Sequence, residues 1–241
     1  MTKPFHAHSA QVLRLAGAGL EELKFPSLIR PDISFDSAPT KELINWVVQL
    51  YSFSLLSQLR AVLGGVISLV ETRNIPALRM LVRALFEMGA HSCYVKRHVT
   101  QRLEANHPGE AWEFLLPLGT STLYTMSPYS EDSSLFPSPA HIDKVIHCFN
   151  EIMEGDALES YSLLSEFCHV DMAVFKQHYD WEGSRVVTFD VPERDLSKVL
   201  PLGASSTLAA LDAVSELLEL ANETEIRTKV VGMLARIVSS R

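Results

Sequence analysis

The fold of this chain is decided by the stretch NIPALRMLVRALFEMGAHSCY, from Asn74 to Tyr94. Asn74 is of a type that caps helices, and Pro76 suits a first helical turn. At about 100° per residue, apolar side chains cover one side of this helix. Polar residues recur every fourth position along the other side, and we call this set the polar seam: Arg79, Arg83, Glu87 and His91. The stretch therefore predicts an apolar helix with one polar line.

A later segment, ESYSLLSEFCHVDM, repeats this arrangement. Tyr161, Ser165 and His169 follow one another at the same spacing of four, beside apolar Leu163 and Leu164. If the two helices pack side by side, these polar residues meet the polar seam. If they do not, both sets face solvent.

The helix from Asn74 to Glu104 is preceded by a second long helical pattern, from Thr40 to Thr72. Because only a few residues separate them, they are expected to form an antiparallel pair. With the Asp156 to Tyr179 helix packed on this pair, the fold class predicted is an all-α helical bundle.

Further helices are expected near residues 5–24, 139–153, 205–221 and 223–238, and Gly203 to Ser206 is interpreted as a loop. The run WEGSRVVTFDVPE, residues 181–193, is rich in β-branched residues, so the bundle should contain at most one short strand-like segment. Residues 116–138 are dense in Ser and Pro and are expected to form an irregular excursion.

The composition favours a single domain over residues 1–241, because 47% hydrophobic residues can build one large core. A formal net charge of -8 disfavours a broad nucleic-acid surface or an anionic-membrane surface. The apolar run from Leu43 to Val70 contains several polar residues, so we interpret it as a core helix and expect no membrane association.

The cysteines Cys93, Cys148 and Cys168 are odd in number and lack CxxC spacing. Reduced, buried thiols are therefore expected. The N-terminal residues also lack the apolar centre of a signal peptide, so a cytoplasmic location is expected.

The motif Arg83-x-x-x-Glu87, followed by Tyr161-x-x-Leu164-Ser165-x-x-x-His169, resembles that of a widespread bacterial family known only as a domain of unknown function. The His-bearing helix is also similar to that of abortive-infection and HEPN-type proteins, many of which are metal-independent ribonucleases of phage defence or toxin systems. This chain has Val170 after the motif histidine, where the family commonly has proline. The resemblance implies a shared helical core, bacterial origin and pairing of two copies through helices.

Three interpretations of Arg83, Glu87, Tyr161, Ser165 and His169 remain open. In a catalytic site, Arg83 and His169 are the cation and the base, held in place by Glu87 and Tyr161. In a structural network, the same groups satisfy one another's hydrogen bonds in the interior. In the third interpretation both sets are solvent-exposed faces.

The resemblance also draws attention to Arg102-x4-His107, because HEPN ribonucleases use an arginine and a histidine four to six residues apart. Here Leu103 follows the arginine, where a polar residue is usual, and Pro108 follows the histidine. A solvated helix end explains the same residues without chemistry.

A di-iron carboxylate bundle is a further alternative. Glu104-x-x-His107 and Glu166-x-x-His169 have the required spacing. The other two ligands would come from the acidic residues of the neighbouring helices, Glu71 or Glu87 with Glu151 or Glu154. Because Glu104 and His107 fall at a helix end, we expect no metal, and no cofactor motif is present.

Together these patterns predict a cytoplasmic bacterial module that recognises a protein partner or a small ligand, in defence or stress response. A HEPN-like ribonuclease is the first alternative and the di-iron bundle the second. Homo-oligomerisation is a further hypothesis.

Overall fold

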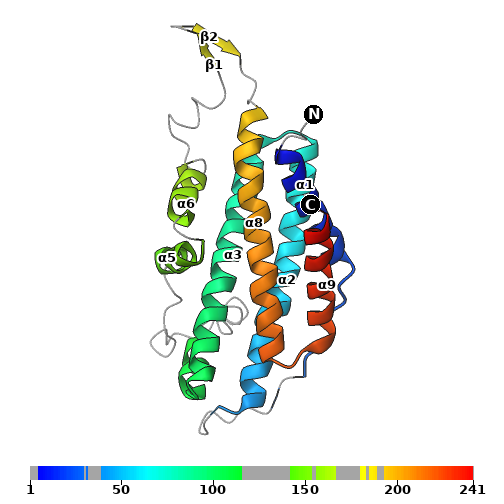
Figure 1. Cartoon of the computed structure of the whole chain (residues 1–241), viewed down its shortest axis with the longest axis vertical. Coiled ribbons are helices and arrows are strands. Elements are labelled where there is room, and N and C mark those ends of the chain that lie inside the picture. The colour runs from blue at the N-terminus through cyan, green and yellow to red at the C-terminus, as the bar shows by residue number, and fades with distance from the viewer. Residues whose placement is uncertain are drawn as a thin grey trace, which may run out of the picture.

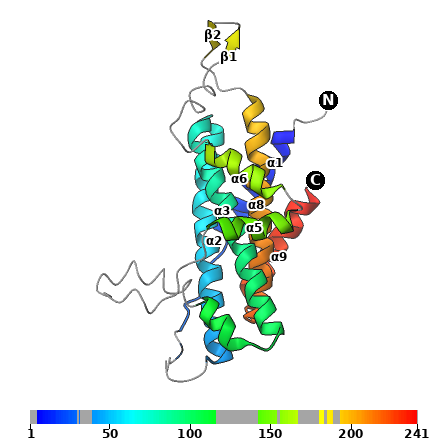
Figure 2. The same cartoon turned by 90° about the vertical axis from the view of Figure 1, so that its left-hand side faces the viewer.

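The computed structural model describes residues 5–29, 31, 39–115, 142–153, 156–166, 180–182, 185–188 and 193–240. The chain is an all-α bundle, as predicted. The long helices α2 (Lys41–Glu71), α3 (Ile75–Glu104) and α8 (Glu193–Leu220) lie side by side, with α1 (Phe5–Glu21) and α9 (Thr224–Ser239) along one side (Figure 1). Two short helices, α5 (Ile142–Ile152) and α6 (Ala157–Glu166), run across the other side of α3 rather than along it (Figure 2).

The antiparallel pair α2–α3 forms as the sequence predicted, and its caps explain where each helix begins. The Thr40 hydroxyl accepts a hydrogen bond from the Leu43 amide at 3.2 Å. The Asn74 side chain accepts one from the Ala77 amide at 3.3 Å. Arg73 adopts a φ of 54° in the tight turn between the helices. Each cap satisfies a backbone donor that has no partner inside its helix.

The start predicted for α8 was wrong, because Gly203 to Ser206 lie inside this helix and not in a loop. This segment packs closely on α3. A Cβ added at Gly89 of α3 would stand 2.7 Å from the Ser206 carbonyl oxygen. The Ser205 hydroxyl donates to the Pro201 carbonyl of the preceding turn at 2.8 Å, so it is satisfied within its own helix. Small side chains therefore serve close helix packing here.

The core lies where α1, α2, α3, α5, α8 and α9 pack their apolar sides against one another. Phe86 of α3 meets Phe149 of α5 edge-on, with ring centroids 5.3 Å apart. Leu56, Leu59 and Leu63 of α2 are completely buried. The apolar face predicted for the Asn74 helix is confirmed, because Val82, Leu85 and Phe86 are all buried.

Within the described residues, α2 is the one helix long and apolar enough to cross a membrane by length and composition. In its most apolar 18-residue window, 33% of the residues are buried inside the bundle. Its buried residues pack against α1, α3 and α8.

The strand-like segment supplies two strands. β1 (Asp180–Glu182) pairs antiparallel with β2 (Arg185–Thr188), with Trp181 opposite Val186. The single strand-like segment that the sequence predicted therefore forms a two-stranded antiparallel ribbon. Of the predicted Asp156 to Tyr179 helix, α6 is described. Residues 167–179 and the predicted excursion at 116–138 lie outside the described residues.

Candidate functional site

Three residues of the two predicted motifs form one hydrogen-bonded cluster, which we call the Arg83 triad: Arg83, Glu87 and Tyr161. Arg83 Nε donates to Glu87 Oε1 at 2.9 Å, and Arg83 Nη2 donates to the Tyr161 hydroxyl at 3.1 Å. The Tyr161 hydroxyl donates in turn to Glu87 Oε1 at 3.1 Å. The triad therefore joins α6 to α3.

The triad sits at the edge of the core. The side chains of Arg83 and Glu87 are 27% and 35% exposed. The Tyr161 ring stacks on Phe86, with centroids 6.1 Å apart, and the Arg83 guanidinium carbon lies 5.3 Å from the centre of the Tyr161 ring. An ion pair as exposed as Arg83–Glu87 adds less than about 1 kcal/mol to stability by charge alone. Its main contribution is therefore to hold the Tyr161 hydroxyl in place. The triad orients α6 on α3.

The four residues of the polar seam lie in different environments. Arg79 is buried, with 3% of its surface exposed. His91 turns to α2, where its Nδ1 lies 2.9 Å from the Tyr51 hydroxyl. Burial lowers the pKa of His91 and raises that of Tyr51. On an α-helix, each step of four residues leaves a rotation of about 40°. Two such steps lead from Arg83 to His91, so His91 points away from the Arg83 triad and toward α2.

The other two predicted site residues, Ser165 and His169, are not part of the triad's described contacts. Ser165 is partly buried, and its hydroxyl is shielded and has no hydrogen-bond partner within the described part of the chain. His169 lies outside the described residues. The structure therefore brings together three of the five predicted site residues, and their described contacts are those of a hydrogen-bonded network.

Arg102 and His107 point to different partners. Arg102 Nη1 lies 3.0 Å from His98 Nδ1, and its guanidinium carbon lies 5.1 Å from the centre of the Phe114 ring. His107 Nδ1 lies 3.0 Å from Glu110 Oε1. The two side chains are therefore held by separate neighbours.

The acidic residues considered for a di-iron centre are also separated. Glu71 lies 3.9 Å from Arg14, Glu87 belongs to the triad, and Glu151 pairs with Arg97. Within the described ranges, no three His, Cys, Asp or Glu side chains are grouped so that they could hold a metal ion. His169 and Glu154 lie outside those ranges.

The sequence did not reveal a groove that lies between α1, α6 and α8. Its volume is about 560 Å³. Apolar residues from all three helices line it, together with Phe86 of α3: Val12, Ala157, Leu163, Leu202, Ala204 and Leu208. Asp156, Glu159 and Lys198 also line it. Because it is assembled from distant segments, no local pattern could have indicated it.

The groove and the Arg83 triad share a wall. Phe86 lines the groove and stacks on Tyr161, and the neighbouring Ser160 also lines the groove. The triad therefore fixes the helix that forms one side of the groove.

Comparison with protein-family models, with curated proteins and with solved structures found no match to this chain.

Proposed function

We propose that this protein is a recognition module that binds a small amphipathic molecule in the groove between α1, α6 and α8. The observation behind this proposal is the groove itself. Its volume of about 560 Å³ is in the range of small-molecule sites, which are mostly apolar with a few polar groups. Phe86, Leu202 and Leu208 supply the apolar surface.

The charges along the groove also favour an amphipathic ligand. Lys198 of α8 lines it together with Asp156, which directly precedes α6, and Glu159 of α6. None of the three has an ion pair within the described part of the chain. Charged groups of both signs can thus orient the polar end of a ligand whose apolar part lies on Phe86.

In this proposal the Arg83 triad has a positioning role. Its three side chains bond one another and hold α6, which lines the groove, on α3. The resemblance of the motif helices to the bacterial family supports a setting in the bacterial cytoplasm, in defence or stress response.

The proposal is tested with 1-anilinonaphthalene-8-sulfonate, an amphipathic dye that fluoresces in apolar sites. Ser160→Trp places a large ring into the groove and should abolish the fluorescence gain. Ser162→Trp is the matched control, because Ser162 is exposed on the same helix and does not line the groove. Equal fluorescence in both variants would refute the groove as the binding site.

The competing ribonuclease hypothesis needs its own assay. The assay measures RNA cleavage by the purified protein and by His169→Ala. If the protein degrades RNA, and His169→Ala loses this activity but keeps its circular dichroism spectrum, the protein is a ribonuclease and the proposed recognition function is wrong. No RNA cleavage is expected.

A further inference from the structure

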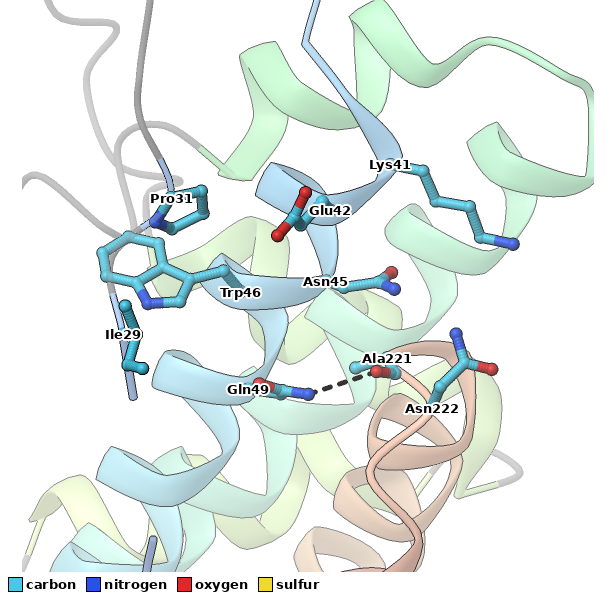
Figure 3. A pocket seen from close by; sticks show the side chains of 9 residues that line it. All are labelled: Ile29, Pro31, Lys41, Glu42, Asn45, Trp46, Gln49, Ala221 and Asn222. Atoms are coloured by element: carbon cyan, nitrogen blue, oxygen red, sulfur yellow. Dashed lines mark hydrogen bonds between the residues drawn. The ribbon is translucent and has the colours of Figure 1, made fainter. Parts of the chain in front are cut away.

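A second pocket lies at the other end of the bundle, between the first turns of α2 and the turn that joins α8 to α9. Its volume is about 490 Å³. Figure 3 shows the Trp46 indole beside Ile29 and Pro31 on one side of this pocket. The carboxamides of Asn45, Gln49 and Asn222 lie on the other side (Figure 3). The pocket thus combines a flat aromatic surface with several amide groups.

One of these amides holds the pocket together, and two are available to a ligand. Gln49 Nε2 donates to the Ala221 carbonyl at 3.2 Å, which ties α2 to the end of α8. The carboxamides of Asn45 and Asn222 make no hydrogen bond within the described part of the chain. Each carboxamide offers both a donor and an acceptor. Donor and acceptor groups therefore both line the pocket.

The formal charges around the pocket cancel. Lys41 and Glu42 both line it, and neither has an ion pair among the described residues. A strongly charged ligand would gain attraction from one of them and repulsion from the other. The lining thus favours an uncharged ligand.

We propose that this pocket binds an uncharged nucleobase-type heterocycle, as a free nucleoside. The flat ring would stack on Trp46, since every base presents a π-face to an aromatic side chain. Its polar edge would bond to Asn45 and Asn222, because a carboxamide matches an adjacent donor and acceptor on a base edge. A polynucleotide is disfavoured, because its phosphates would approach a chain of net charge -8. The inference does not depend on the groove between α1, α6 and α8.

The experiment is calorimetric titration of the full chain with adenosine, guanosine, cytidine and uridine, and with ribose alone. At least one nucleoside should bind, and ribose should not. Binding by ribose as strong as by the nucleosides, or no binding by any nucleoside, would overturn the proposal.

Two variants locate the binding. Asn222→Gly removes the carboxamide and keeps the backbone, because Asn222 has a φ of 56°, which glycine adopts freely. Trp46→Leu removes the stacking surface and keeps an apolar side chain. Each should weaken nucleoside binding at least about tenfold. Asn106→Gly is the matched control, with a φ of 59° at the end of α3, and should bind like the parent chain. Equal affinity in the Asn222 and Asn106 variants would refute the site.

Discussion

The Tyr161 hydroxyl lies 3.1 Å from Arg83 Nη2, although the two residues are 78 positions apart in the chain. With Glu87 they complete a triangle of hydrogen bonds at the edge of the core. This contact holds α6 across α3, and α6 forms one wall of the groove.

Removing the hydroxyl with Tyr161→Phe should destabilise the protein by about 1 kcal/mol, because two hydrogen bonds are lost while the stack on Phe86 remains. Urea denaturation measures the change. Tyr94→Phe is the control, since the Tyr94 ring packs on His98 and Phe114 and its hydroxyl makes no hydrogen bond within the described ranges. Equal losses in the two variants would contradict a role for the triad.

Stability should fall as the pH drops below about 6.5, the ordinary pKa of histidine. Burial lowers the pKa of His91 and of His98, and nearby Arg102 lowers that of His98 further. The unfolded chain then binds protons more readily than the folded one, so the free energy of unfolding is larger above that pH and decreases below it.

His91→Gln should reduce this pH dependence, because glutamine can still accept a bond from Tyr51 but does not titrate. The measurement is the urea midpoint near pH 7.5 and near pH 5.5. His147→Gln, on the exposed side of α5, is the control. If His91→Gln loses as much stability on acidification as the parent chain, His91 is not a source of the effect.

Gly89→Ala should destabilise the protein by about 2 to 3 kcal/mol, because the new methyl group would stand 2.7 Å from the Ser206 carbonyl oxygen. A backbone atom cannot rotate away from it. Gly64→Ala should instead stabilise by about 0.5 to 1 kcal/mol, since the Cβ there would have no neighbour within 4 Å and alanine favours helix. Thermal unfolding of both variants tests the pair, and effects of the same sign would contradict the close packing of α3 on α8.

Ser52→Ala should stabilise the protein by about 1 kcal/mol. Ser52 is completely buried, and its hydroxyl has no hydrogen-bond partner within the described part of the chain. Ser92→Ala is the matched comparison, because Ser92 is equally buried but donates to the Gly89 carbonyl at 2.8 Å. Ser92→Ala should be neutral or slightly destabilising when the free energy of unfolding is measured by chemical denaturation. A loss of stability in Ser52→Ala would contradict the expected cost of the unpaired hydroxyl.

The sequence predicted those features that depend on neighbours along the chain. The residues that begin α2 and α3, Thr40 and Asn74, cap them by local hydrogen bonds. The Arg83–Glu87 pair likewise follows from helical spacing of four. Such contacts are visible in sequence because they do not depend on how the helices pack.

Contacts between distant segments needed the tertiary structure. Gly203 to Ser206 form weak helix on their own, and packing against Gly89 of α3 decides that they are helical. The neighbour that His91 contacts, Tyr51 on another helix, was likewise decided by helix packing.

By itself the sequence determined an all-α bundle, its long helix pair and one polar line on α3, because hydrophobic periodicity and capping act over a few residues. Only the tertiary structure decided that Tyr161 joins Arg83 and Glu87, that His91 turns away to Tyr51, and where the groove and the Trp46 pocket lie. These features arise where segments far apart in the chain meet, and the burial of many apolar side chains at once selects which segments do so.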